Sequence, residues 1–372
     1  MAAPARSFEP SPPTDLTLPD PGSLTARAIF SMALRKLFED LKALRLGPEA
    51  SPAAQRDYRT LREVLVGFLP GRPGAIASLL RQPTVSAPLR CLLHELPDTD
   101  GYVAELVGQS LYALALDGLV PEGVSQLAPP PALLSPRHDA VASVPEGTLA
   151  FDALPAPARG HFAAVTEALW LATADNNPER MRDAHPDKEG NAIDLGGKPS
   201  EAWIASLRAA LALVGDHLPD VRREMDLALT LAVPVGYEPV KHLSASYRQA
   251  IGTVYLTLHP NPVVMAEALV HEHSHAKINA LLELDPILND HWEKTFPSPY
   301  RPDPRPMMGV LLGAHAFVAV ERFLEALGDP AFEGHLADLR RKNREAVATL
   351  ARDARPTPVG AGLIDELQRL AG

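Results

Sequence analysis

The sequence predicts a mainly α-helical protein with a small β-sheet beside one helix that carries candidate metal ligands. Apolar residues recur at helical spacing over residues 24–116 and again over most of the chain after residue 200. Residues 251–258 are instead rich in β-branched and aromatic side chains, as strands are. Hydrophobic content of 46% and charged content of 22% are values typical of globular proteins.

Composition also narrows the partners and the compartment. The net charge of −11, with no Lys/Arg block, argues against nucleic acid and against an anionic membrane surface. No run approaches the ~18 apolar residues of a transmembrane helix, and the N-terminus lacks the apolar core of a signal peptide. The single Cys91 cannot form an internal disulfide. We therefore expect a soluble, cytoplasmic protein.

Four regions follow one another along the chain. Residues 1–22 are rich in proline without an apolar pattern, which predicts a disordered arm. Residues 23–118 form a helical N-terminal region, and 119–158 form a Pro-rich linker or crossing segment. Residues 159–372 contain the candidate chemistry and are the predicted catalytic domain.

The elements of this last region are predicted from their periodicity. The expected helices cover residues 162–171, 201–218, 220–231, 262–284, 308–327, 333–354 and 361–371. The expected strands cover residues 231–235 and 251–258. Residues 285–307 contain prolines at 297, 299, 302, 304 and 306, which predict an irregular segment.

The helix over residues 262–284 has clear boundaries. Asn261 can cap its free N–H groups, and Pro262 occupies the first helical position, where it sacrifices no hydrogen bond. Pro286 ends it, because the residue before a proline is disfavoured in helical geometry. The strand over 251–258 leads directly into this helix, so a sheet edge lies near it, where an extended peptide could add as a further strand.

This helix contains the pattern His-Glu-x-x-His. His271 and His275 are four residues apart, so their rings leave the same face and can bind one metal ion. Glu272 lies beside them for proton transfer or support. Apolar residues on both sides indicate a buried helix, in which such groups are costly without a metal partner. His273 points to the opposite side and is interpreted as a spectator.

Two later features could complete a site. Arg301 and Arg305 alternate with prolines, which would fix them as a clamp for a carboxylate; the alternative is two solvated arginines. His315 lies in the apolar helix over 308–327, as a core histidine or as a third metal ligand. Glu321 and Glu325 are the carboxylate alternatives, although both are expected to face solvent.

The motif and its surroundings resemble a known family. Residues 269–282, followed by Tyr-Arg-Pro-Asp-Pro-Arg-Pro over 300–306 and by Gly-Val-Leu over 309–311, look like the HExxH-motif peptide β-hydroxylases of ribosomal peptide (RiPP) gene clusters. The resemblance spans roughly residues 230–327 and fades towards the N-terminus. It implies an oxygenase that uses Fe(II) and α-ketoglutarate (2-oxoglutarate) to hydroxylate a side-chain β-carbon of a precursor peptide.

The resemblance also implies roles for the residues. We place the third iron ligand at His315, because no other histidine lies on the helix after the arginine-containing segment. Arg301 or Arg305 would bind the distal carboxylate of α-ketoglutarate. Two alternatives stay open: a zinc metallopeptidase with a zincin-like α+β core and Glu272 as general base, and a non-catalytic peptide-binding protein with a structural metal.

Overall fold

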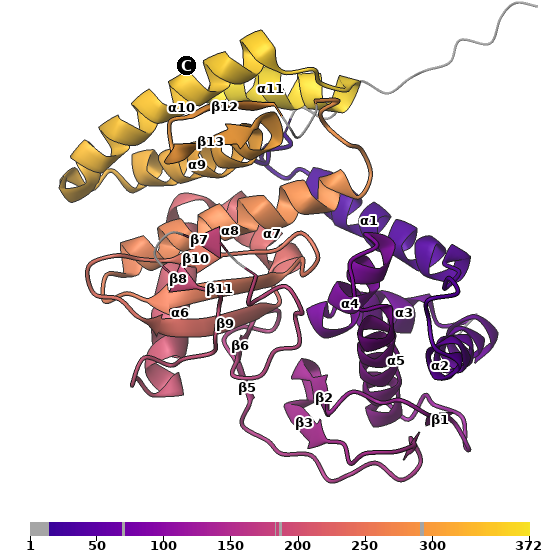
Figure 1. The fold of residues 1–372 in the computed structure, drawn as a ribbon. Coiled ribbons are helices and arrows are strands. Elements are labelled where there is room, and N and C mark those ends of the chain that lie inside the picture. Colours follow the sequence, from indigo (N-terminus) through magenta and orange to yellow (C-terminus); the bar gives the residue numbers. More distant parts are fainter. Residues whose placement is uncertain (1–14, 69–70, 183, 186–187, 291–293) are drawn as a thin grey trace, which may run out of the picture.

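The N-terminal region is helical, as predicted. The computed structural model describes residues 15–68, 71–182, 184–185, 188–290 and 294–372. Helices α1 (Thr25–Ala43), α2 (Pro52–Glu63), α3 (Pro73–Leu80), α4 (Pro83–Leu93) and α5 (Thr99–Leu116) follow one another, with a short π-helical turn at Val64–Phe68. They form the purple half of the molecule in Figure 1. Leu37, Leu61, Val103 and Leu111 are among the residues of their shared core.

The Pro-rich segment over 119–158 packs onto this half instead of linking two halves freely. It forms two antiparallel pairs, β2 (Ala132–Ser135) with β3 (Ala140–Ser143), and β1 (Ser125–Gln126) with β4 (Leu149–Ala150). Leu133, Ala142 and Phe151 belong to the same hydrophobic core as α5. Of the two expectations for this segment, a linker or a crossing segment, its packing agrees better with the second, because the apolar residues between its prolines provide buried side chains.

A five-stranded mixed sheet lies beside the N-terminal half. Its strand order is β10 (Ser244–Ala245), β11 (Thr253–Leu258), β9 (Leu231–Tyr237), β6 (Trp170–Ala172) and β5 (Phe162–Ala164). The three inner strands are parallel, and the two outer ones are antiparallel to their neighbours. The predicted strands at 231–235 and 251–258 are confirmed, whereas the predicted helix over 162–171 is wrong and is replaced by β5 and β6.

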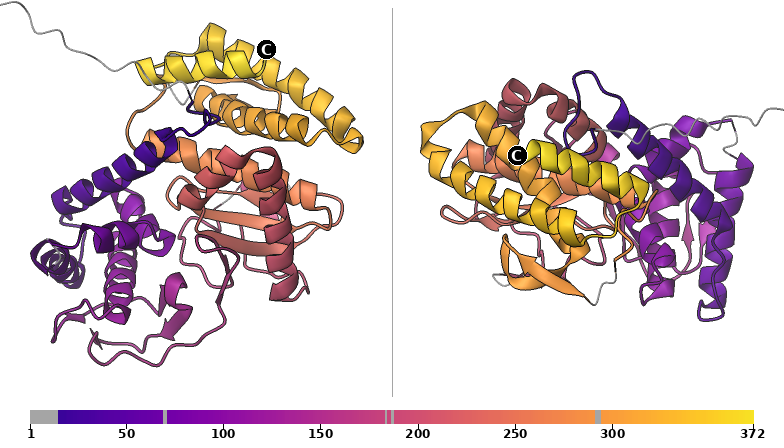
Figure 2. Two further views of the ribbon diagram at one scale, coloured as in Figure 1. Left: turned by 180° about the vertical axis from the view of Figure 1, so that it is seen from behind. Right: turned by 90° about the horizontal axis from the view of Figure 1, so that it is seen from above.

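Helix α8 (Pro262–Leu282) is the central element of the molecule. With α6 (Ser200–His217) and α7 (Pro219–Ala228) it lies on one side of the sheet, and its apolar side chains share a core with those of β9 and β11. On its other side it packs on α9 (Met307–Leu327), followed by α10 (Glu333–Asp353) and α11 (Pro358–Leu370). Figures 1 and 2 show α8 between the sheet and these C-terminal helices.

The segment between α8 and α9 is more regular than its prolines predict. Strands β12 (Thr295–Ser298) and β13 (Arg301–Pro306) form an antiparallel hairpin, with Phe296 opposite Arg305. Prolines fit here because the two strands have no further neighbours, so most backbone N–H groups need no partner in a ladder. The expectation of irregular structure is wrong for this part.

Helix α9 is the one described helix that is long and apolar enough to cross a membrane. Its most apolar stretch is 72% buried inside the protein, where Val310, Val318 and Phe323 are among its core side chains. These are the properties of a core helix. Together with the other helices and the small sheets, it confirms the predicted fold class, mainly α with a small sheet beside the motif helix.

The residues just before α1 are anchored in the core. The carboxylate of Glu366 on α11 accepts hydrogen bonds from the backbone N–H groups of Leu16, Thr17 and Leu18, at 2.7–3.1 Å. Leu16 is 2% exposed. The predicted disordered arm is thus wrong for residues 15–22, and its remaining part, 1–14, lies outside the described residues.

Candidate functional site

Helix α8 begins as its sequence predicts. The side-chain oxygen of Asn261 accepts a hydrogen bond from the N–H of Val263 at 2.9 Å, and Pro262 is the first helical residue. The helix then runs for almost six turns with most side chains buried. The cap and the proline set the position at which the helix begins.

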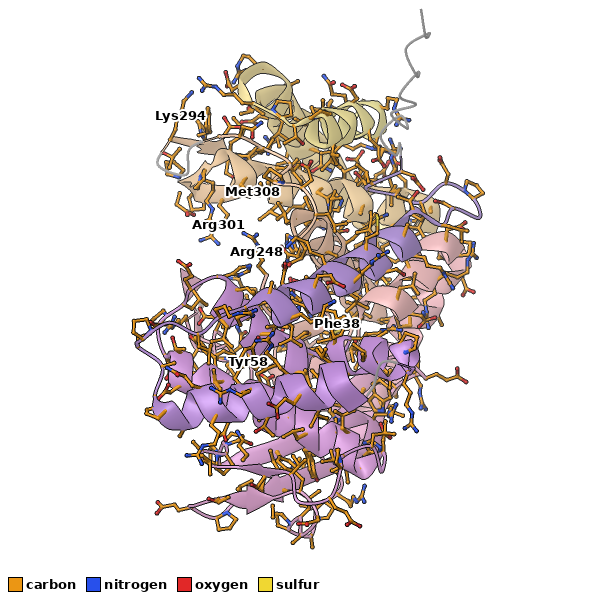
Figure 3. All side chains as sticks on the ribbon, turned by 90° about the vertical axis from the view of Figure 1, so that its right-hand side faces the viewer. Phe38, Tyr58, Arg248, Lys294, Arg301 and Met308 are labelled. Carbon is orange, nitrogen blue, oxygen red and sulfur yellow. The ribbon has the colours of Figure 1, made fainter. Side chains whose placement is uncertain are left out.

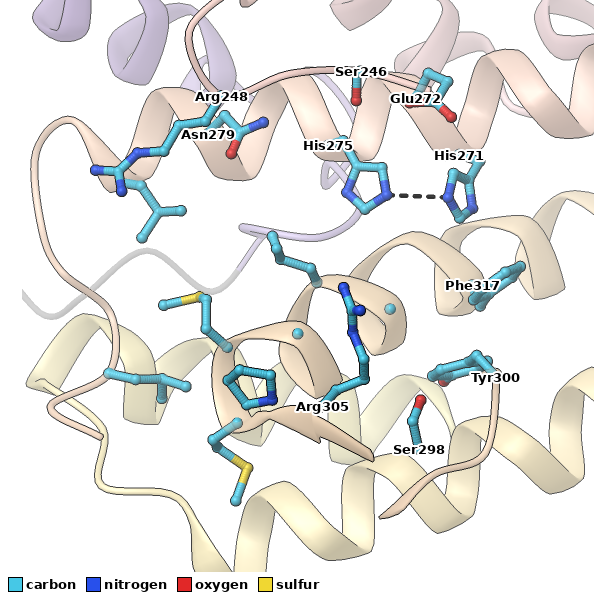
Figure 4. A pocket seen from close by; sticks show the side chains of 18 of the residues that line it. Ser246, Arg248, His271, Glu272, His275, Asn279, Ser298, Tyr300, Arg305 and Phe317 are labelled. Carbon is cyan, nitrogen blue, oxygen red and sulfur yellow. Dashed lines mark hydrogen bonds between the residues drawn. The ribbon is translucent and has the colours of Figure 1, made fainter. Parts of the chain in front are cut away.

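His271 and His275 meet on the face of α8 that is directed away from the sheet. Their Nε2 atoms are 3.0 Å apart, and Figure 4 shows both rings pointing into the same space. Burial lowers the pKa of both imidazoles, that of His271 most strongly, and each charge would oppose the other. Both rings are therefore neutral at neutral pH, the form in which imidazole binds metal ions.

Glu272 and His273 differ in their surroundings. Glu272 borders the same cavity as the two histidines, and its Oε2 atom is buried without a hydrogen-bond partner among the described residues. His273 points the other way, with its Nε2 atom 3.6 Å from Glu224 of α7 and its side chain 2% exposed. The expectation that His273 points to the opposite side of the helix is confirmed, and its interpretation as a spectator stays a prediction.

The histidine pair borders a cavity of about 870 Å³. One wall is α8, the opposite wall is the first half of α9 together with the β12–β13 hairpin, and a third is formed by Ser244, Ala245 and Ser246 at the edge strand β10. The expected proximity of a sheet edge to the histidines is confirmed. A site of this size accommodates a small ligand together with part of a larger one.

Arg301 and Arg305 both line this cavity from β13. They share Asp303 as a counter-ion, at 2.9 Å from Arg301 Nε and 3.1 Å from Arg305 Nη1. The bond from Arg301 holds the pKa of the Asp303 carboxyl below its usual range. In Figure 4 the side chain of Arg305 extends from the hairpin towards the histidine pair. The structure thus brings both arginines and both histidines to one cavity.

Two glycines of α9 make room for this arrangement. A Cβ atom on Gly309 would lie 3.2 Å from the Cβ of Arg305, and one on Gly313 would lie 2.8 Å from the ring of Tyr300. Both contacts are tighter than ordinary van der Waals contact. The hairpin can lie close along α9 only because these positions carry no side chain.

The structure does not bring His315 to the pair. Its ring is fully buried, its Nε2 atom contacts the carbonyl oxygen of Leu16 at 3.2 Å, and it is absent from the cavity wall. Burial lowers its pKa to about 3. The placement of the third ligand at His315 is therefore wrong in this structure. On α9, residues 309, 313 and 317 face the cavity, and position 315 lies on the other side of the helix.

Neither carboxylate alternative lies at the cavity. Glu321 is buried, not solvated as expected, and accepts a hydrogen bond from Asn343 at 2.6 Å. Glu325 is bonded to Arg322 and Arg340. Within the described ranges, no three His, Cys, Asp or Glu side chains are grouped so that they could hold a metal ion.

The donor set nevertheless fits a metal ion. Metal–imidazole bonds are about 2.0–2.1 Å long, so nitrogens 3.0 Å apart can both reach one ion. The unpartnered oxygen of Glu272 would gain a nearby cation or a metal-bound water. In the contact between the two half-buried rings, one imidazole donates and the other accepts.

Several cavity residues were not singled out from the sequence. Asn279 continues the four-residue spacing of His271 and His275, and that spacing would have identified it. Phe317 packs edge-on against the ring of His271, with centroids 4.7 Å apart, and Tyr300 stacks on Phe317 at 4.6 Å. The sequence gives no local signal for either contact, since both depend on how α9 and the hairpin dock on α8.

Arg248 is another cavity residue that was not singled out from the sequence. It follows β10 in the connection to β11, and it lines the cavity opposite the β12–β13 hairpin. Its side chain is exposed. A solitary arginine in a connecting segment carries no sequence pattern that marks it as functional.

No protein-family model matches the chain, and a search of curated proteins finds no match.

Proposed function

We propose that the chain is an Fe(II)- and α-ketoglutarate-dependent oxygenase that hydroxylates a side-chain β-carbon of a peptide. The observation that carries the proposal is the meeting, in one cavity, of the His271/His275 pair with Arg305. The histidines supply neutral nitrogen ligands, and the arginine supplies a fixed positive charge that faces them. The resemblance to the HExxH-motif peptide β-hydroxylases supports the same assignment.

The keto acid accounts for the arginine. A keto acid held at a metal between His271 and His275 would keep its far carboxylate free, and a cation of the cavity would bind that carboxylate. Arg305 is the better placed of the two arginines, because its side chain extends towards the histidines. Asp303 orients both guanidinium groups from outside, which lowers the entropy that is lost when the ligand binds.

Iron with bound keto acid would supply the oxidising chemistry, and the chain's residues supply its surroundings. His271 and His275 hold the ion, and the ring of Phe317 restricts the position of His271. Glu272 accepts a hydrogen bond from a group at the ion or takes up a proton there. The closely packed helix α8 keeps bulk water away from the side of the site that faces the sheet.

The edge strand β10 supports a peptide as the substrate. Leu243 directs its carbonyl oxygen to the N–H of Thr257 on β11, at 2.9 Å. Backbone groups alternate in direction along a strand, so those of Ser244 point away from β11, to the edge that pairs with no other described strand. Ser244 also lines the cavity. A peptide in extended conformation could pair with this edge and present one side chain to the histidines.

We also propose a compartment and a partner for the enzyme. We place the enzyme in the cytoplasm, since its lone Cys91 is buried and its thiol pKa is raised by burial to about 12, as for an inert structural thiol. Its partner there would be a precursor peptide.

A zinc metallopeptidase is the second candidate, and the free oxygen of Glu272 at the cavity favours it. In that enzyme Glu272 would activate a metal-bound water, and the peptide would again lie along β10. A peptidase has no use for a carboxylate clamp, so Arg301 and Arg305 favour the oxygenase.

The two functions are separated by one set of assays on anaerobically purified protein. The oxygenase predicts iron-dependent release of succinate from α-ketoglutarate, coupled to a 16 Da gain (one oxygen atom) on a peptide. The peptidase predicts zinc-dependent cleavage that needs neither O₂ nor α-ketoglutarate and is lost in Glu272→Gln. Cleavage of this kind would replace the proposal, and the absence of both activities would favour the non-catalytic peptide-binding alternative.

A further inference from the structure

Three arginines line one cavity: Arg248, Arg301 and Arg305. The keto acid of the proposed function has a single free carboxylate, which one arginine satisfies. Two guanidinium groups therefore remain at the same cavity without an assigned ligand. We call Arg248 and Arg301 the rim arginines.

Three acidic residues of the cavity wall have partners other than these three arginines. Glu272 has one buried carboxylate oxygen, Oε2, without a hydrogen-bond partner among the described residues. The other three are engaged elsewhere: Glu283 pairs with Arg90 at 3.4 Å, Asp285 accepts a hydrogen bond from Thr357 at 2.6 Å, and Asp290 accepts one from the backbone of Arg355 at 2.8 Å. Asp303 is the one carboxylate bonded to Arg301 and Arg305, and it is shared between them.

Arg248 has no hydrogen bond or ion pair from its side chain to any residue that the structure describes. It is exposed, and it starts from the wall opposite the hairpin that carries Arg301. In Figure 3 the two rim arginines extend towards each other at the same opening of the molecule. Two guanidinium groups thus flank this opening, although the whole chain carries a net charge of −11.

The position of Arg248 relates it to the bound peptide. It lies three residues after Ala245, the last residue of the edge strand β10 along which the peptide would lie. A peptide that extends along this edge beyond Ser246 would pass between the rim arginines. One of its side chains would then reach both guanidinium groups.

We propose that the rim arginines form a second carboxylate subsite, which takes an acidic side chain of the substrate peptide, with Arg248 as its specificity-determining residue. This inference rests on the proposed function for the presence of a peptide. It does not depend on the chemistry at the metal. A planar guanidinium binds a carboxylate through two parallel hydrogen bonds, which fixes the register of the peptide along β10.

The test measures binding of the full-length protein loaded with redox-inert zinc, without α-ketoglutarate. Short fluorescein-labelled peptides with amidated C-termini carry one Glu at successive positions in an Ala/Ser/Thr background, with Gln at the same position as the neutral match. At one position we expect Glu to bind about fivefold more tightly than Gln, the range of a partly exposed ion pair, and the preference to weaken with added salt.

Two variants and one control assign the effect. Arg248→Gln should remove the preference for Glu, and Arg248→Glu should reverse it in favour of Lys at the same position. Arg344→Gln removes the same charge from an exposed arginine of α10 outside the cavity, and it should leave the preference unchanged. Because Arg248 and Arg344 are both exposed, these variants should fold normally.

The proposal is overturned if Glu and Gln peptides bind equally at every position, if no peptide binds, or if the preference survives in Arg248→Gln. Failure of this subsite can be distinguished from failure of the proposed function. An Arg248-dependent preference without succinate release would retain the subsite and reject the oxygenase. Peptide hydroxylation without any preference for Glu would do the opposite.

Discussion

Three histidines within five residues of α8 have different surroundings. His271 and His275 face the cavity with their Nε2 atoms 3.0 Å apart, whereas His273 faces Glu224 on the other side of the helix. This separation follows from the helical period alone, so the sequence was sufficient to predict the pair. It also provides matched variants for testing metal binding.

The first prediction concerns these histidines. His271→Ala or His275→Ala should lower metal affinity by more than about 100-fold. Removing a residue that only contacts a metal ligand costs up to about 100-fold, and removing the ligand itself should cost more. Competition with a coloured chelator measures the affinity. His217→Gln, on α6 away from the cavity, is the control and should bind as the wild type does. Full metal retention in both alanine variants would place the site elsewhere.

The orientation of His315 could not be predicted from the sequence in the same way. His315 lies on an apolar helix after the arginines, but the side of α9 that faces α8 is set by Gly309, Gly313 and Phe317. Position 315 is rotated away from that side, towards Leu16. The rotation of one helix against another depends on packing across both helices, and no local pattern around residue 315 encodes it.

A second prediction follows from the burial of His315. Its folded-state pKa of about 3 lies below the ordinary value of 6.5, so the unfolded chain binds a proton more readily between these values. Stability is therefore lost as pH falls below 6.5. The His315→Gln variant keeps a donor for the Leu16 carbonyl but has no imidazole to protonate. Between pH 6.5 and pH 5 its free energy of unfolding should therefore fall by about 2 kcal/mol less than that of the wild type.

Urea unfolding of metal-free protein at the two pH values measures this difference. Burial also lowers the pKa of His271 and His273, so the wild type retains a pH dependence from those groups in either case. The comparison between the two proteins isolates His315. If the wild type and His315→Gln lose the same free energy of unfolding, the pKa of His315 does not differ between the folded and unfolded states.

At the scale of elements, the hairpin and α9 together shape the cavity. The ring of Tyr300 lies against Gly313 and stacks on Phe317, and its hydroxyl donates to Asn343 of α10 at 2.6 Å. These contacts position β13, and with it Arg305, relative to the histidine pair. A side chain at position 313 would displace the hairpin.

A third prediction tests this packing. Gly313→Ala should raise the apparent KM for α-ketoglutarate by about tenfold or more, because the new Cβ would lie 2.8 Å from Tyr300 and shift Arg305. Gly334→Ala, on α10 with no atom within 4 Å of the new Cβ, is the control. It should leave KM unchanged and stabilise the protein by about 0.5–1 kcal/mol. Equal KM values in both variants would reject the role of the glycine.

Elements differ in how well the sequence predicts them. Long amphipathic helices such as α6 and α10 were identified correctly, since their apolar spacing repeats over many turns. Strands β5 and β6 were mistaken for a helix, because two short apolar runs joined by a turn imitate helical spacing. The β12–β13 hairpin was missed because its prolines disfavour central strands, and this hairpin has none.

At the scale of the whole molecule, the N-terminal region is connected to the cavity by a buried ion pair. Arg90 of α4 lies 3.4 Å from Glu283 at the end of α8, with the two side chains 4% and 7% exposed. Arg90 also donates to the carbonyl oxygen of Gln249, next to Arg248. This contact could not be predicted from the sequence, because its two residues are almost 200 positions apart.

A fourth prediction concerns this pair. Arg90→Met should destabilise the protein by about 3 kcal/mol, because it leaves the Glu283 carboxylate buried and unpaired. The double variant Arg90→Met/Glu283→Leu should recover most of that loss, since it removes both charges. Denaturant unfolding measures both values. A double variant no more stable than the single one would show that the charge of Glu283 is not the cause.

The central claim is that the His271/His275 pair and Arg305 together hold a metal ion and a keto acid. Calorimetric titration of α-ketoglutarate into anaerobic, Fe(II)-loaded protein tests it most directly. We predict one equivalent bound in the presence of metal and none in its absence. Arg305→Met should weaken binding by about 10- to 100-fold while metal content stays unchanged. Binding that ignores both the metal and Arg305, or no binding to the loaded protein, would contradict the claim.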